Sequence, residues 1–267
     1  ERLASSAFRR ALRELAAGAG VGLLAVDEAH CVTAWGHDFR PAFLAVGRRA
    51  RRWAAGPSGE PPLAALTGTA TRAQLGEAVS ELGLRRPISV ARSLARPELS
   101  FVVERCGAGE HLPRLRRWLS RHPGARFGPG LIFCGTVDGR LGAAAVHEEL
   151  LWGENLEAGL FTGRAPARED ASKWRETKAR QARSFLEGRL DWLCCTSAFG
   201  LGVDVPRARF CVHLGLAGSL EGYFQEASRA GRDGANAVCR LLLHLYDESR
   251  ARRWFSSAMP LGQVAAA

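Results

Sequence analysis

The sequence predicts an α/β fold built on parallel sheets and divided into two lobes. Short apolar runs alternate along the chain with amphipathic helical patterns, and continuous apolar runs of this length suit strands buried on both faces. With 267 residues, the chain is long for one core and fits two compact domains. The expected strands are residues 21–26, 62–66, 99–104, 130–135, 157–161, 191–196, 209–214 and 238–245.

Amphipathic helical patterns lie between these runs. The expected helices are residues 7–17, 41–54, 72–82, 112–121, 138–150, 168–186 and 220–230. Prolines, arginines and glycines mix over residues 84–110 and mark the junction between the lobes. We therefore expect a first lobe at residues 1–107, a second lobe at residues 108–250 and a tail at residues 251–267.

The charge balance is strongly basic, with a net charge of +10, and Lys173 and Lys178 are the only lysines. An excess of positive charge favours a polyanionic partner, nucleic acid above all. A GC-rich genome also predicts an excess of arginine, so charge alone leaves both explanations open. No apolar run approaches the roughly twenty residues of a membrane helix, and we expect a soluble protein with no membrane partner.

The seven cysteines form no C-x-x-C pair and no Cys/His spacing typical of a metal site. We therefore expect neither a zinc site nor a disulfide framework. Most of the cysteines lie in apolar runs, where a thiol packs as a small hydrophobic group. This usage predicts a reducing, intracellular compartment.

Asp27 and Glu28 follow directly on the apolar run at residues 21–26, within the sequence DEAH. In open α/β sheets, ligands bind beyond the carboxyl ends of the strands. Nucleotide hydrolases place there a carboxylate that holds Mg²⁺ and another that orients water on the γ-phosphate. An Asp-Glu pair after a strand is also common without such a role, so this motif needs support from the rest of the chain.

An aromatic-rich stretch follows these acids within a few residues. It interleaves aromatic rings with basic groups, as in a platform that stacks unpaired bases and contacts a phosphate. Buried core aromatics are the alternative. The residues concerned are Trp35, His37, Phe39, Arg40 and Phe43.

Arg229 and Arg232 are three residues apart at the end of a helical pattern, so both can face one site. Paired guanidinium groups stabilise the charge that spreads over a phosphoryl group during its transfer. A solvated helix end is the alternative for this short string.

The stretch 25–43 resembles the Walker B segment and the aromatic-rich loop of RecQ-family DNA helicases. Further segments resemble the family's motifs in the family's order, and together they cover the chain from residue 1 to about residue 245. The resemblance implies two RecA-like lobes, the first of them incomplete. The further segments are LTGTATR (66–72), SLARPELSF (93–101), LIFCGTVDG (131–139), TSAFGLGVDVPRARFCVHLG (196–215) and YFQEASRAGRDG (223–234).

The resemblance also implies roles for individual residues. Arg232 is the expected arginine finger, with Arg229 and Gln225 beside it. Asp204 is the expected nucleotide or coupling contact, and Gly202 permits a tight turn next to it. The aromatic-rich stretch is the sensor that links strand binding to ATP turnover.

Three threonines complete the expected site. Thr69 and Thr71 are expected to hydrogen-bond near His30 and to relay nucleotide state, although Thr71 also has the spacing of a helix cap. Thr136 is a candidate contact to a DNA phosphate through its hydroxyl group.

The activity implied is that of an ATP- and Mg²⁺-dependent DNA helicase that moves 3′ to 5′ and serves recombination, repair and replication. Its expected partners are single-stranded DNA and forked duplex, in the nucleus if the source is a eukaryote. A catalytically dead nucleic-acid-binding remnant of a helicase is the first alternative. An RNA helicase of a related DExH group is the second.

The chain departs from the family in one major feature. It contains no G-x-x-x-x-G-K-[ST] phosphate loop, because neither of its lysines follows a glycine or precedes Ser or Thr. The resemblance places that loop before the first residue of this chain. This polypeptide alone is therefore expected neither to hydrolyse ATP nor to unwind DNA.

Overall fold

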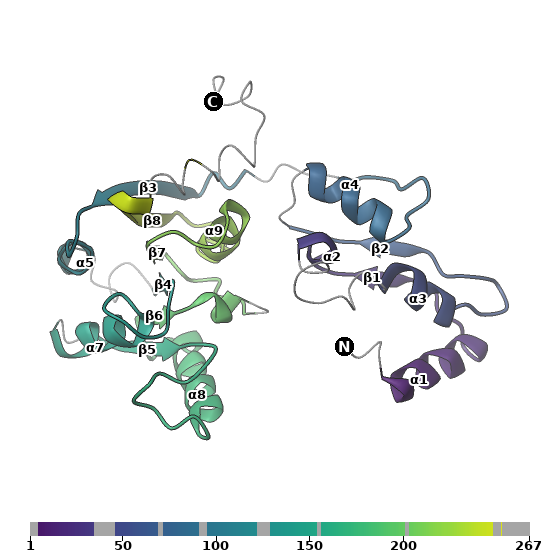
Figure 1. Ribbon diagram of the computed structural model, residues 1–267, viewed down its shortest axis with the longest axis horizontal. Helices are drawn as coiled ribbons and strands as arrows, with labels where there is room; N and C mark the ends of the chain where they lie inside the picture. Colours follow the sequence, from purple (N-terminus) through teal and green to yellow (C-terminus); the bar gives the residue numbers. More distant parts are fainter. Residues whose placement is uncertain are drawn as a thin grey trace. The chain divides into compact units, whose positions relative to one another are not determined.

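The computed structural model describes residues 5–34, 46–68, 72–90, 95–121, 129–153, 156–200, 203–247 and 252. The chain divides into two compact units, Glu1–Leu94 and Ala95–Ala267 (Figure 1). The sequence places this boundary after residue 107, whereas residues 99–106 form a strand of the second unit. The reason is the pairing of that strand along its whole length with residues 237–244, the last strand among the described residues, which no local pattern reveals.

The first unit holds a small parallel sheet between helices. Strand β1 (Leu24–Val26) pairs in parallel with β2 (Leu63–Ala65), and the described core here consists of Ala29, Val32 and Leu82 with apolar neighbours around them. The helices are α1 (Ser6–Ala17), α2 (Cys31–Ala34), α3 (Val46–Trp53) and α4 (Arg72–Glu81).

The second unit is built on a six-stranded sheet in the order β3-β8-β7-β4-β6-β5, and all of its strand pairs are parallel. The strands are β3 (Leu99–Cys106), β4 (Gly130–Cys134), β5 (Ala158–Phe161), β6 (Trp192–Cys195), β7 (Phe210–Leu214) and β8 (Ala237–His244). The helices are α5 (His111–Arg121), α7 (Ala143–Gly153), α8 (Trp174–Leu186) and α9 (Leu220–Ala227), with short 3₁₀ turns at Ser197–Gly200 and Leu245–Asp247.

Helices cover both faces of this sheet, so its strands are buried on both sides. Along β4, Leu131 and Phe133 pack in one core, whereas Ile132 and Cys134 pack in the other. Helices α5 and α7 contribute to the second of these cores, and α9 contributes to the first. The continuous apolar runs are thereby explained, and the predicted parallel α/β architecture is confirmed.

The predicted strands are all present, although β1 begins at Leu24 rather than at residue 21 and the short helix α2 after it was not predicted. Helix α8 begins at Trp174 rather than at residue 168. Helix α7 begins at Ala143 rather than at residue 138, because Gly139 has φ 97° and Gly142 donates its backbone N–H back to Gly139. Helix α9 ends at Ala227 rather than at residue 230, because the chain turns through Gly231 with φ 64°. All seven cysteines are buried, as predicted for most of them. Among the described residues, no helix has the length and apolar character needed to cross a bilayer.

Candidate functional site

Asp27 and Glu28 lie in a tight turn directly after β1, as predicted. The Glu28 backbone N–H donates to Asp27 Oδ1 at 2.8 Å, and Glu28 has φ 49°, in the left-handed region. Such a conformation is uncommon for a side chain with a Cβ and is often found at functional sites. The turn is held to the end of β2 because Ala29 donates to the Leu66 carbonyl and Leu66 donates to Val26. The Glu28 side chain is 45% exposed and available to a ligand.

His30 connects this turn to the segment after β2. Its Nδ1 lies 2.8 Å from Thr67 Oγ1 and 3.4 Å from Glu28 Oε2. The residues predicted for this contact, Thr69 and Thr71, lie outside the described residues. Sequence reasoning passed over Thr67, although it stands in the same LTGTATR segment two residues earlier. A hydrogen bond between His30 and Thr67 couples the acidic turn to the chain that leaves the neighbouring strand.

Several other predicted site residues also lie outside the described part of the chain and stay predictions. They are Trp35, His37, Phe39, Arg40 and Phe43 of the aromatic-rich stretch, and Gly202 of the FGLGVDVP segment.

The second unit brings Arg229, Arg232 and Asp204 together. Arg232 Nη1 lies 3.0 Å from Asp204 Oδ1, and both side chains are accessible, at 39% and 68% exposure. Arg229 is 3% exposed and donates from Nη1 to the Val203 carbonyl at 3.0 Å and from Nη2 to the Gly200 carbonyl. Both arginines therefore contact the chain between β6 and β7. Arg229 binds backbone carbonyls there, and Arg232 binds the Asp204 side chain.

The two arginines differ in environment. Desolvation on burial lowers the pKa of Arg229, and the positive charge of Arg232 lowers it further, although a guanidinium group stays charged at any ordinary pH. The Arg229 side chain is occupied with backbone carbonyls, whereas Arg232 keeps an accessible guanidinium group. Gln225 lies half-buried on α9, and its carbonyl accepts a hydrogen bond from Ser228 Oγ at 3.2 Å.

Arg96 is a site residue that sequence reasoning missed. It lies shortly before β3 and donates to the carbonyls of Ser228, Ala230 and Gly231 at 3.1–3.2 Å. It also pairs with Glu98, and this hydrogen bond holds the pKa of the Glu98 carboxyl below its usual value. The arginine-proline segment SLARPELSF was the available signal, but the carbonyl groups that Arg96 binds lie more than a hundred residues away in the sequence. Arg96 therefore holds the turn that carries Arg229 and Arg232.

Replacing Arg96 with alanine is expected to loosen this turn. Carbonyl groups that lose a donor cost about 1–3 kcal/mol when they stay buried, so we expect the free energy of unfolding to fall by about 2 kcal/mol. Hydrogen-exchange mass spectrometry is expected to show faster exchange at residues 228–232. Arg175→Ala, at an exposed site on α8, is the matched control. Equal exchange in the two variants would contradict the role given to Arg96.

Thr136 lies in the exposed loop after β4, where the sequence predicts it. Its hydroxyl donates to the Asp138 carbonyl at 2.9 Å. The Asp138 carboxylate accepts from the Ala167 backbone at 3.0 Å and pairs with Arg164 at 2.6 Å, and these contacts lower the pKa of Asp138. The loop that carries Thr136 is thus tied to the segment after β5.

Arg96 and Thr136 lie at opposite ends of strands of the second sheet. Thr136 follows the carboxyl end of β4. Arg96 precedes β3, and the backbone N–H of Gly231 donates to Ala208, just before β7 begins. Arg96 and Gly231 therefore lie where strands begin, and the candidate phosphate contact lies where a strand ends.

Comparison with known proteins shows what this chain is similar to. Residues 110–234 match the model of the helicase conserved C-terminal domain. The probable ATP-dependent DNA helicase RecS of Bacillus subtilis (strain 168) is 32% identical over 223 residues, which are 83% of this chain and 41% of RecS. The chain belongs to the RecQ family of helicases.

Two further RecQ-family relatives show similar identity. The ATP-dependent DNA helicase RecQ of B. subtilis is 33% identical over 92% of this chain and 38% of its own length. The RecQ-like DNA helicase blm-1 of Caenorhabditis elegans is 32% identical over 87% of this chain and 22% of its own length. The chain thus spans less than half the length of these relatives.

Solved structures agree on the fold. The DEAD-box helicase Mss116 bound to ssRNA and UDP-BeF superposes with a TM-score of 0.70 over 93% of this chain and 49% of Mss116, at 13% sequence identity. The DUF1998 helicase MrfA bound to DNA and AMPPNP gives a TM-score of 0.60 over 88% of this chain and 33% of MrfA. The RecA-like helicase fold of this RecQ-family chain is therefore confirmed.

Proposed function

We propose that this chain is the part of a RecQ-type helicase that completes ATP hydrolysis and contacts DNA, in a protein that separates DNA strands while moving 3′ to 5′. The observation that carries the proposal is the turn after β1, where two carboxylates follow a parallel strand and Glu28 adopts a strained conformation. Such a turn suits a nucleotide hydrolase.

The acidic turn fits Mg²⁺ and ATP. Magnesium needs only one or two protein carboxylates when phosphates supply its other ligands. Asp27 would hold the ion, Glu28 would orient the attacking water, and His30 would sense the state of the nucleotide. When bound, Mg²⁺ neutralises charge that develops on the phosphates.

The second unit is proposed to stabilise the transferring phosphoryl group. The accessible guanidinium group of Arg232 suits an arginine finger, and Asp204 holds it ready by an ion pair. Gln225, near the end of α9, and Gly202 are proposed to assist beside the nucleotide. Buried Arg229 is proposed to position this segment by its bonds to the backbone carbonyls of residues 200 and 203.

DNA contacts are proposed for the aromatic-rich stretch, with Trp35, His37, Phe39 and Arg40 binding unpaired bases and a phosphate, and for Thr136 at the end of β4. Single-stranded and forked DNA are the proposed substrates. Recombination and repair are the proposed processes, inside the cell and in the nucleus where the source is a eukaryote.

Strand separation by the natural polypeptide that contains this chain tests the proposal. We expect ATP- and Mg²⁺-dependent unwinding of a duplex with a 3′ single-stranded tail, and none with a 5′ tail. Glu28→Gln is expected to retain DNA binding and to lose turnover, because the amide cannot activate water as the carboxylate does. Glu14→Gln, at an exposed site on α1, is the control. Wild-type turnover in Glu28→Gln would contradict the proposal.

A nucleic-acid-binding protein without hydrolysis is the second candidate function. It is favoured by the net charge of +10, which suits nucleic-acid binding and does not itself require hydrolysis. DNA binding by the natural polypeptide, without ATP binding or turnover, would support this candidate against the first.

A further inference from the structure

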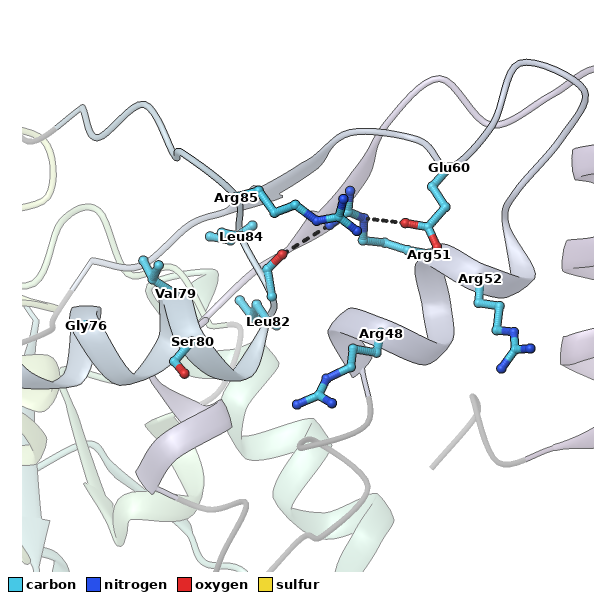
Figure 2. Close-up of a pocket in the computed structure, with 11 residues that line it drawn as sticks. Arg48, Arg51, Arg52, Glu60, Gly76, Val79, Ser80, Leu82, Leu84 and Arg85 are labelled. Atoms are coloured by element: carbon cyan, nitrogen blue, oxygen red, sulfur yellow. Dashed lines mark hydrogen bonds and ion pairs between the residues drawn. The ribbon is translucent and has the colours of Figure 1, made fainter.

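A pocket of about 620 Å³ in the first unit has four arginines among its eleven described lining residues. It lies between α3, the end of α4 and the chain before β2 (Figure 2). Arg48, Arg51, Arg52 and Arg85 face it, and Glu60 is the one acidic residue among its described lining residues. The pocket is therefore strongly positive.

The packing of α3 holds this arrangement in place. A Cβ at Gly47 would lie 2.5 Å from the Leu82 carbonyl oxygen, so the helix is pressed against the chain at the end of α4. Arg51 Nη1 donates to the Gly83 carbonyl at 3.3 Å, and its Nε lies 3.6 Å from Glu60 Oε2. The dashed lines in Figure 2 mark these two contacts. Arg51 thus stabilises the wall of the pocket by its contacts with Glu60 and with the Gly83 carbonyl.

The guanidinium groups of the other three arginines are accessible to a ligand. Arg48, Arg52 and Arg85 are exposed, and within the described part of the chain no ion pair engages them. Arg48 and Arg52 are four residues apart on α3 and share one face, where like charges repel each other. In Figure 2 both guanidinium ends point away from Glu60. Anions bound at the two guanidinium groups would relieve this repulsion.

We propose that this pocket binds the phosphodiester backbone of a nucleic acid strand. Four residues of helix rise by about 6 Å, so Arg48 and Arg52 can contact two phosphates rather than enclose one. Guanidinium groups suit phosphate oxygens, and the described lining contains no aromatic ring for base stacking. Binding here is therefore independent of sequence. The proposed function identifies the ligand as nucleic acid, and the inference depends on it to that extent.

The test compares two double variants of the chain that remove the same charge. Arg48→Gln/Arg52→Gln alters the pocket, and Arg10→Gln/Arg13→Gln alters exposed arginines of α1 in the same unit. Binding of a labelled single-stranded oligonucleotide is measured by fluorescence anisotropy over a range of salt concentrations, without nucleotide. The pocket variant is expected to bind about tenfold more weakly at low salt, with the log–log salt slope smaller by about 1.4. The control is expected to stay within about twofold of wild type.

Each contrary outcome has a distinct meaning. An equal loss of DNA affinity in both variants would attribute the effect to net charge and overturn the site. Unchanged DNA affinity in the pocket variant would also overturn it. Circular dichroism checks that both variants fold. A polyglutamate peptide that competes as well as unlabelled DNA would assign the pocket to acidic protein segments and overturn the proposal. Absence of ATP turnover in the natural polypeptide that contains this chain, with this binding intact, would instead reject the proposed function alone.

Discussion

Replacing Arg232 with alanine is expected to slow DNA-stimulated ATP turnover about a thousandfold, because an arginine that stabilises the transferring phosphoryl group contributes at least that much. Turnover is measured in the natural polypeptide that contains this chain. DNA affinity is expected to change less than about twofold. The protein is expected to stay folded, because the ion pair with Asp204 is accessible to solvent and such pairs contribute little to stability.

Two further variants sharpen this prediction. Arg232→Lys is expected to recover only part of the turnover, since an ammonium group is a point charge without the planar fork of arginine. Arg175→Ala, at an exposed site on α8, is expected to leave turnover unchanged. Wild-type turnover in Arg232→Ala would remove this residue from the reaction.

Replacing Arg229 with methionine is expected to destabilise the second unit by about 3 kcal/mol. Methionine fills much of the same space but leaves the partly buried carbonyls of Gly200 and Val203 without their donor, and each lost partner costs about 1–3 kcal/mol. The midpoint of urea unfolding, with an unchanged slope, is the measurement.

Arg232→Met is the matched control for this second prediction. The two residues are three apart in the same turn, yet the control is expected to stay within about 0.5 kcal/mol of the wild-type stability, because its side chain is accessible. Equal destabilisation by the two substitutions would contradict the division of roles between a positioning arginine and an exposed one.

The sequence by itself determined the strands and helices, and the polar residues that directly follow strands. Continuous apolar runs predicted the strands of both sheets, since residues buried on two faces leave an unbroken signal. The positions of Asp27, Glu28 and Thr136 were predictable for a related reason, because each follows directly on such a run. Family motifs in order predicted the RecQ relationship that comparison with known proteins confirmed.

Only the tertiary structure decided which distant residues meet. It attached residues 99–106 to the second unit through pairing with β8, and it placed Arg96 against the turn that ends at Gly231. It also buried Arg229 while leaving its neighbour Arg232 accessible. Sequence spacing could not separate these two arginines, because a hydrogen bond to a backbone carbonyl depends on where the chain passes and carries no side-chain signature. The same holds for the arginine pocket, whose walls come from α3 and from the chain after α4.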